Sequence, residues 1–287
     1  MHLAVLGSAD SWYLRDLVRA AGTAHRVTSI PFSTLGCRLS NQRLEPPLLA
    51  DAVLVRSMPP GSLEQVVFRM DLLARWEVAG TLVVNPPRAI EAAVDKFLAS
   101  AKLQAAGLPI PRTICCQTAL DAMAAFDELG CDVVVKPLFG SEGRGIARLQ
   151  DEALALRAFR MLEQLGALIY LQEFIPHEGH DLRVLVVGQR VLGMRRTNPH
   201  DWRTNISRGA RGEPLEVTAE LANIAKRAAD AVGAPLAGVD LLPGRDRTLY
   251  AIEVNAVPGW RALARVAGVD VARLVLEYIA SRAAGGS

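Results

Sequence analysis

Residues 133–146 read Val133-Val134-Val135-Lys136-Pro137-Leu138-Phe139-Gly140-Ser141-Glu142-Gly143-Arg144-Gly145-Ile146. The β-branched run predicts a buried strand, and a core strand does not carry a lysine such as Lys136 without a partner. We therefore expect Lys136 to leave the core and meet an anion. The residues that follow suit a mobile loop whose backbone N–H groups close over phosphate oxygens, namely Gly140, Ser141, Gly143 and Gly145.

This glycine loop differs from the two best-known nucleotide motifs. The lysine precedes the glycines, which excludes a GxxxxGK[ST] P-loop, and residues 146–149 predict a second strand rather than the helix that follows GxGxxG. The segment is therefore predicted to form a strand–loop–strand hairpin. A glycine-rich hairpin whose lysine simply reaches solvent remains the alternative.

Composition narrows the class of protein. The chain has 287 residues, of which 51% are hydrophobic and 22% charged, so it has material for a large core. A net charge of +2 and 5% aromatic residues argue against nucleic acid as a partner. Four cysteines without a CxxC pair favour reduced thiols over zinc or disulfides. No apolar run approaches the ~20 residues that a bilayer demands, so we expect a soluble, cytoplasmic protein that contacts no membrane.

The first 87 residues have an α/β pattern. Strands are predicted at 3–6, 27–32, 52–55 and 82–84, with helices at 12–21 and 63–79. The second helix has a predicted apolar face of Val66, Val67, Met70, Leu73 and Val78. Gly7-Ser8 could form a dinucleotide-binding turn, but the other glycines of that fingerprint are absent. Asn85-Pro86-Pro87 is interpreted as a domain boundary.

The middle of the chain adds a second candidate binding segment. We expect one helix at 89–106 carrying Asp95-Lys96, a strand at 112–116, helices at 120–129 and 152–165, and a strand at 168–176. Gln172-Glu173 interrupts the last strand, and a buried carboxylate there needs a donor such as an adenine amino group. The alternative is that the strand has reached solvent.

The last third predicts antiparallel strands and a metal site. Strands are expected at 181–187 and 190–196, with Asp181, Arg183, Arg195 and Arg196 on one face; a polar loop at 200–209 and a helix at 219–232 follow. A second hairpin pairs 236–242 with 249–255. If Asp240 lies opposite Glu253 and Asn255, their oxygens would suit Mg²⁺ or Mn²⁺ shared with nucleotide phosphates. An exposed acidic face is the alternative.

Taken together, these motifs resemble the ATP-grasp superfamily, and within it the RimK-type α-L-glutamate ligases. The matching pieces occur in the family's order: Asp95-Lys96, Lys136-Pro137 with Gly140 to Ile146, Gln172-Glu173-Phe174-Ile175, Asp181-x-Arg183, Trp202-Arg203-Thr204-Asn205, Gly238-Val239-Asp240 and Glu253-x-Asn255-x-x-Pro258-Gly259. Residues 61–71 further resemble the ligases that glutamylate tetrahydromethanopterin. The resemblance implies an N-terminal pre-ATP-grasp α/β domain at 1–87, a central ATP-grasp subdomain at 88–176 and a C-terminal subdomain with the metal site at 177–287.

The resemblance also implies the role of each candidate residue. ATP and two Mg²⁺ or Mn²⁺ ions would bind, the metals at Asp240, Glu253 and Asn255. The remaining assignments are Lys96 and Lys136 to the α/β-phosphates, Gln172, Glu173, Phe174 and Ile175 to the adenine, Asp181 to the ribose, Thr204 to the nucleotide, and Arg183, Arg203 and Asn205 to the reacting groups.

The activity that the resemblance implies is ATP-dependent glutamate ligation through an acyl phosphate, releasing ADP and phosphate. The partners would be L-glutamate and a small carboxylate acceptor of the tetrahydromethanopterin or methanofuran kind, and the protein could form a homo-oligomer, a dimer or tetramer. Ligation to the carboxyl end of a protein and a non-catalytic ATP-binding module are the alternatives. Trp260-Arg261 departs from the ribosomal-protein ligases; Trp260 either faces the acceptor or packs under a helix at 271–280.

Overall fold

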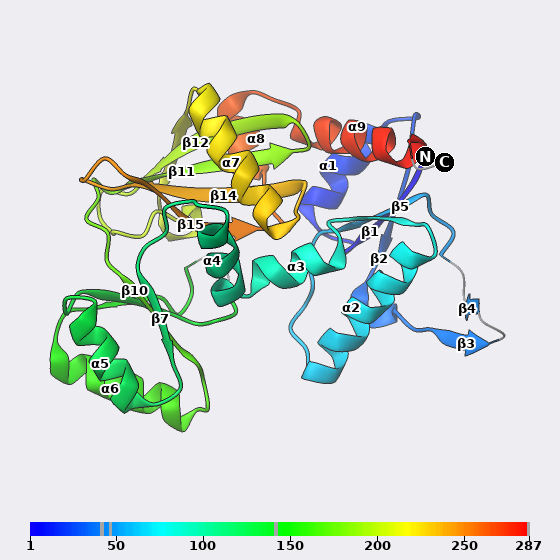
Figure 1. The fold of residues 1–287 in the computed structure, drawn as a ribbon. Helices are drawn as coiled ribbons and strands as arrows, with labels where there is room; N and C mark the ends of the chain where they lie inside the picture. The colour runs from blue at the N-terminus through cyan, green and yellow to red at the C-terminus, as the bar shows by residue number, and fades with distance from the viewer. Residues whose placement is uncertain (41–42, 46–47, 141–142, 286–287) are drawn as a thin grey trace.

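The computed structural model describes residues 1–40, 43–45, 48–140 and 143–285. The N-terminal part is a parallel sheet in the order β2-β1-β5-β6 (Figure 1). Its strands are β1 His2–Leu6, β2 Arg26–Ile30, β5 Ala52–Val55 and β6 Leu82–Val84. Short elements between β2 and β5 are η1 Phe32–Thr34, β3 Arg38–Ser40 and β4 Arg43–Glu45. The predicted α/β opening is confirmed, and the sheet order changes direction between β1 and β5.

One helix covers each face of this sheet. Alternate strand residues point to opposite sides, so each face has its own apolar side chains to bury. Leu3 and Val5 share a core with α1 Trp12–Ala21, whereas Ala4 and Leu6 share another with α2 Leu63–Val78. Both helices begin at a serine cap, and that of α2 is a capping box between Ser62 and Gln65.

The predicted apolar face of α2 is wrong in part. Met70 and Leu73 are buried as expected, but Val67 and Val78 are 47% and 78% exposed. Trp76 is buried and moves the buried stripe around the helix, and at 3.6 residues per turn Val67 and Val78 then lie on the opposite side. The bulky ring, rather than the number of valines, determines which face packs.

The helix predicted at 89–106 is broken in two. The structure has α3 Pro87–Val94 and α4 Lys96–Ala105, with Asp95 between them in extended conformation. The Asp95 carboxylate accepts hydrogen bonds from the N–H groups of Phe97 and Leu98, which caps the second helix. Lys96 is therefore the first residue of α4, where its side chain can leave the helix.

The central subdomain is an antiparallel sheet in the order β7-β10-β8-β9. Its elements are β7 Thr113–Cys116, α5 Ala119–Glu128, β8 Val133–Lys136, β9 Ala147–Leu149, α6 Glu152–Gln164 and β10 Ile169–Glu173. β8 and β9 pair as the predicted hairpin on either side of the glycine loop. The two helices cover the sheet with a core of their own, and Figure 1 shows this part as a separate lobe.

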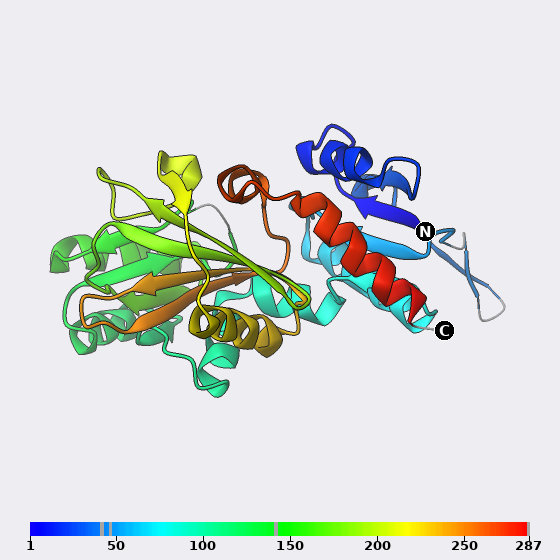
Figure 2. The ribbon, with the colours of Figure 1, turned by 90° about the horizontal axis from the view of Figure 1, so that it is seen from above.

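The C-terminal sheet is antiparallel in the order β13-β12-β11-β14-β15. Its elements are β11 His180–Val187, β12 Arg190–Thr197, η2 Ile206–Arg208, β13 Arg211–Pro214, α7 Ala219–Val232, β14 Leu236–Pro243, β15 Leu249–Asn255, α8 Arg261–Ala267 and α9 Val271–Ala284. Helix α9 returns to the N-terminal sheet and packs beside α1, as Figure 2 shows.

The first and last thirds of the chain share their cores. One hydrophobic cluster contains Val53 of the N-terminal sheet together with Val239 of the C-terminal sheet. Asn85, directly after β6, is buried and donates to Leu236 O at 2.7 Å while accepting from Leu236 N at 3.0 Å. Helices α3 and α4 also contribute to this cluster, although the sequence assigned them to the central subdomain. The segment with an independent core is 114–171.

In the part of the chain that the structure describes, every helix is too short or too polar to cross a bilayer.

Candidate active site

The predicted carboxylates lie side by side on the second hairpin. Asp240 on β14 pairs directly with Glu253 on β15, and Gly238 pairs with Asn255. Asp240 is buried, and the Asn255 Oδ1 accepts from Val257 N at 2.8 Å. The register proposed from the sequence is confirmed, and a β-bulge follows Asp240. Two carboxylates and an amide therefore meet at one point.

Two arginines from the neighbouring strands hold the first carboxylate. Arg183 contacts one oxygen of Asp240 at 2.7 Å, and Arg196 contacts the other at 2.9 Å. Arg196 also donates through Nε to Asp181 at 2.7 Å, and both residues of that pair are buried. Arg195 is exposed, so the prediction that it shares a face with Arg196 is wrong: consecutive strand residues point to opposite sides.

Asp181 has a structural position. It is 1% exposed and both carboxylate oxygens accept from Arg196. The described geometry thus gives Asp181 a different role from the ribose contact that the resemblance implied. It fixes the guanidinium of Arg196, which in turn contacts Asp240.

The predicted lysines are in the electrostatic field of the same carboxylates. Lys136 ends β8, and its ammonium donates to Gln172 Oε1. Burial lowers the pKa of Lys136 to about 8, against the opposing attraction of Glu253. Lys96 donates to Gly140 O at 2.7 Å; burial lowers its pKa too, and Glu253 again opposes the shift. The structure therefore brings both lysines, from α4 and the central sheet, toward the metal-site hairpin.

The donor set fits a divalent cation. Burial and the neighbouring Asp240 raise the pKa of Glu253, because both disfavour its charged form. Each oxygen of Asp240 keeps a lone pair beyond the one that an arginine uses, and Asn255 also keeps one. Within the described residues no three or more His, Cys, Asp or Glu side chains gather, so a site of two carboxylates and an amide suits Mg²⁺ or Mn²⁺ rather than zinc.

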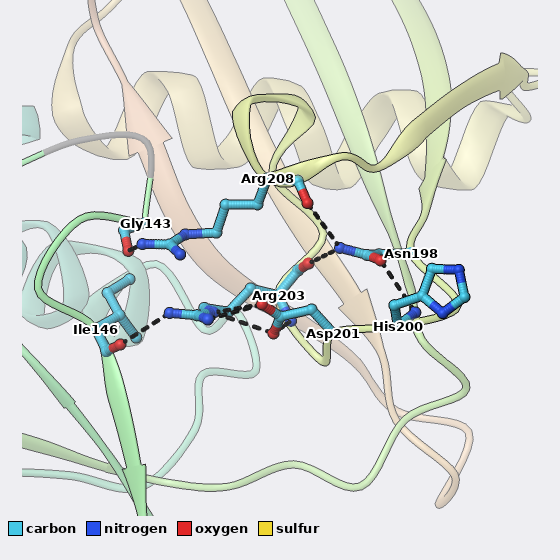
Figure 3. A network of polar contacts seen from close by, with 7 residues as sticks. All are labelled: Gly143, Ile146, Asn198, His200, Asp201, Arg203 and Arg208. Atoms are coloured by element: carbon cyan, nitrogen blue, oxygen red, sulfur yellow. Dashed lines mark hydrogen bonds and ion pairs between the residues drawn. The ribbon is translucent and has the colours of Figure 1, made fainter.

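The polar loop after β12 reaches across to the glycine loop, as Figure 3 shows. Arg208 donates to Gly143 O at 2.8 Å and Arg203 to Ile146 O at 3.3 Å. Asp201 binds Arg203 through both carboxylate oxygens, and Asn198 donates to Arg203 O at 2.9 Å. The polar loop predicted at 200–209 is thus joined to the glycine loop by hydrogen bonds, a contact that was not predicted from the sequence.

The other residues predicted in these two loops lie close to one another where the structure describes them. Asn205 lies against the glycine loop: a Cβ on Gly143 would stand 2.5 Å from its Oδ1, and the φ of +69° also requires glycine there. Thr204 is buried next to it. Gly140 and Gly145 border the loop with positive φ, while Ser141 lies outside the described residues.

The Gln-Glu segment lies at the end of β10, an inner strand of the central sheet. Gln172 is buried, and its amide nitrogen donates to Thr113 and Tyr170, both at 2.9 Å. These two bonds fix the amide so that its oxygen faces Lys136 and accepts from it. Glu173 accepts from Arg112 N at 2.8 Å through one oxygen, which leaves the other for a nucleotide amino group.

The adenine segment continues with two apolar residues. Phe174 packs under the guanidinium of Arg148, at 3.4 Å from the ring centre, and Ile175 is buried. The end of β10 therefore combines a carboxylate oxygen with apolar side chains.

A cavity of about 890 Å³ opens beside the carboxylates, between α1 and the C-terminal sheet. Asp240, Glu253 and Asn255 line it, and so does Arg56, which follows β5. Arg56 was not predicted from the sequence to be a site residue. The available signal was a charged residue directly after the fully apolar strand 52–55, at the carboxyl end of a parallel sheet.

Trp260 does not face the acceptor. It is fully buried, belongs to the core that includes Val271 and Ala272 of α9, and donates through Nε1 to Asp16 at 3.0 Å. The prediction that it offers a flat face at the mouth of the site is wrong, and the alternative of packing with the C-terminal helix is confirmed. Arg261, in contrast, is exposed and lines the cavity.

Comparisons with known proteins agree with this geometry. The sequence profile of the RimK-like ATP-grasp domain matches residues 93–279. The tetrahydromethanopterin:alpha-L-glutamate ligase of Methanosarcina acetivorans is 34% identical, covering 80% of this chain and 79% of its own. The alpha-aminoadipate–LysW ligase LysX of Saccharolobus solfataricus is 30% identical, with 71% and 76% covered.

The fold leads to the same family. The ATP-grasp ligase PsnB, solved with a minimal precursor, matches the structure with a TM-score of 0.78 at 26% identity over 98% of both chains. Another PsnB structure contains Mg and ADP. The expected ATP-grasp fold class is confirmed. The chain is an ATP-grasp ligase and belongs to the RimK-like family.

Proposed function

We propose that this protein joins L-glutamate to a carboxylate of a small C1-carrier cofactor, of the tetrahydromethanopterin or methanofuran kind, with release of ADP and phosphate. The observation that carries the proposal is the pairing of Asp240 with Glu253 beside a cavity of about 890 Å³, with Lys96 and Lys136 near enough to act electrostatically on Glu253. Its similarity to the Methanosarcina acetivorans ligase supports the choice of acceptor.

The nucleotide would occupy the space between the central sheet and the metal-site hairpin. Lys96 and Lys136 are cations suited to the α- and β-phosphates, and Glu173 with the backbone of Phe174 suits the adenine. Asp240, Glu253 and Asn255 would hold Mg²⁺, which when bound supplies charge neutralisation for the phosphates. Arg183 touches Asp240 directly, so it is positioned to steady the reacting oxygens beside the metal ligands.

The chemistry begins with a poor electrophile. The acceptor carboxylate attacks the γ-phosphorus of ATP, the bond to the β–γ bridging oxygen breaks, and ADP leaves behind an acyl phosphate. The amine of glutamate then attacks the carbonyl carbon, phosphate leaves with the C–O electron pair, and the amine loses a proton to give the amide. Charge stabilisation and alignment are the main demands on the protein. Arg203 and Asn205 border the glycine loop and would meet the γ-phosphate and the tetrahedral intermediate.

The test is ADP release on addition of L-glutamate together with each candidate acceptor, followed by mass spectrometry of the product. The acceptors are tetrahydromethanopterin, a methanofuran-type cofactor and a peptide with a carboxyl-terminal glutamate. Turnover with a cofactor and a mass increase of one or more glutamyl residues would support the proposal. Turnover with the peptide alone would favour ligation to a protein, and ATP binding without turnover would favour the non-catalytic alternative.

A second measurement tests the intermediate. With ATP and acceptor but no glutamate, hydroxylamine should trap a hydroxamate of the acceptor, because it attacks an acyl phosphate in place of the amine. Release of pyrophosphate with formation of an adenylate would contradict the proposed phosphate arrangement.

A further inference from the structure

The guanidinium of Arg56 is the starting observation. Arg56 is 6% exposed, and nothing among the described residues accepts a hydrogen bond from its Nε or Nη1. Buried polar groups in folded proteins are nearly always paired, and an unpaired charged group is costly. These two donors therefore require a partner from outside the described chain.

The aromatic neighbours of Arg56 are two nearly perpendicular rings, with 74° between their planes, so its guanidinium lies parallel to at most one of them. The guanidinium carbon lies 4.4 Å from the ring centre of Tyr13 and 4.2 Å from that of Trp260. Rings attract a cation over their faces but accept no in-plane hydrogen bonds of the kind that a carboxylate accepts. Burial lowers the pKa of Arg56 to about 10. The two rings fix the position of the guanidinium and offer no oxygen acceptor to its Nε and Nη1.

The position of Arg56 in the sheet independently indicates a ligand. Arg56 directly follows β5 and Gly7 directly follows β1, at the carboxyl ends of the two strands between which the sheet order changes direction. Open parallel sheets bind ligands in the crevice at such a point. A Cβ on Gly7 would stand 3.5 Å from the Arg56 Cβ. Arg56 lines the cavity that Asp240 and Glu253 also line.

Three other arginines of this cavity already have carboxylate partners. Arg19 pairs with Asp16 and Asp270, both at 2.8 Å, and Arg183 and Arg196 both pair with Asp240. Arg56 thus differs from them in having a buried, oriented and unpaired fork. An arginine fork matches the two oxygens of a carboxylate.

We propose that Arg56 binds a carboxylate of one of the two substrates, so that the N-terminal domain supplies the substrate anchor and the C-terminal hairpin the metal. The carboxylate belongs either to L-glutamate or to the acceptor, and in naming these substrates the proposal rests on the proposed function. Arg56 is a binding residue that holds the substrate by a group remote from the bond that forms.

The test uses binding rather than turnover. The melting temperature of the full-length protein is measured with Mg²⁺ and ADP, alone and with L-glutamate, glutarate or tetrahydromethanopterin. At ten times its dissociation constant, a probe should raise the melting temperature by roughly 2–3 °C. Replacing Arg56 by Met keeps an apolar body between the rings and removes the fork, so the rise should vanish. Arg56→Lys keeps the charge without the fork and should weaken probe binding about tenfold or more.

Arg69 provides the matched control. It is also a buried arginine of the N-terminal domain beside an aromatic ring, Phe32, but it donates to Pro59 O at 2.8 Å and lies outside the cavity lining. Arg69→Met should retain the full ligand-dependent rise, whatever it does to the melting temperature without ligand.

Each outcome is decisive. A rise lost only in the Arg56 variants supports the proposal, and the probe that causes the rise identifies the substrate: tetrahydromethanopterin for the acceptor, L-glutamate or glutarate for the amino acid. No rise in the wild-type protein, or an equal rise in Arg56→Met, overturns it. If Arg56→Met does not fold, an Arg56→Lys protein that binds like wild type overturns it equally. Binding through Arg56 without ADP release would instead count against the proposed function.

Discussion

The burial of Trp260 leads to a large and testable stability effect. Trp260 precedes α8 in the C-terminal part, is fully buried, and contacts the N-terminal domain through Tyr13, Asp16 and Arg56. Replacing a core tryptophan by alanine costs about 3–5 kcal/mol, and loss of the hydrogen bond to Asp16 adds about 1 kcal/mol. We therefore expect Trp260→Ala to lower the free energy of unfolding by about 4–6 kcal/mol.

This free energy converts into a melting temperature. At about 2.1 cal/mol/K per residue, a chain of 287 residues has an unfolding entropy of roughly 0.6 kcal/mol/K, so the expected loss is about 7–10 °C. Differential scanning calorimetry measures it. Trp260→Phe keeps a ring against Arg56 and should lose only about 2–4 °C, with the KM for each substrate within about twofold of wild type. A Trp260→Ala protein that melts within 2 °C of wild type and shows a raised acceptor KM would refute the reasoning.

Three further predictions concern the nucleotide site. Glu253→Gln removes a charge but little volume, so turnover at saturating Mg²⁺ should fall about 100-fold or more while the melting temperature does not fall; unchanged turnover would exclude the metal site. Because phosphates bind the charged form of Lys136, whose pKa is about 8, the dissociation constant for ATP should rise up to about tenfold per pH unit above pH 8, a slope that Lys136→Met should abolish in a calorimetric titration. Arg208→Ala removes the contact to Gly143 O, so amide exchange at Gly143 should quicken without nucleotide; equal exchange in both proteins would show that the contact does not hold the loop.

Features that depend on neighbours in sequence could be predicted from the chain alone. The strand–loop–strand hairpin around the glycines, the serine cap of α2 and the pairing of Asp240 with Glu253 all follow from alternation, capping chemistry and short turns. The break at Asp95 was accessible by the same logic, since aspartate is a strong helix cap, but the uninterrupted alanine-rich pattern favoured one helix.

Features that depend on the docking of distant segments could not be predicted. Nothing near Trp260 in the sequence indicates that Tyr13 and Asp16, about 250 residues earlier, will enclose it. The same holds for Arg56, because only the folded structure shows that it lines the cavity. It also holds for Asp181, whose burial depends on its pairing with Arg196 across the hairpin. The spacing of apolar residues indicates which face of a helix or strand a residue lies on. Which distant residues it contacts depends on tertiary packing.

The buried hydrogen bonds of Asn85 determine which parts of the enzyme can move relative to one another during turnover. They join β6 to β14, so Arg56 and Asp240 belong to one continuous body, together with Glu253 on β15. Lys136 belongs to the lobe with a separate core. Any opening and closing between the two bodies changes the distance from Lys136 to the carboxylates. The distance from Arg56 to the carboxylates stays the same. The cavity lined by Arg56, Asp240 and Glu253 is thus formed before nucleotide arrives, and the entropy of aligning these side chains is lost during folding rather than in each turnover.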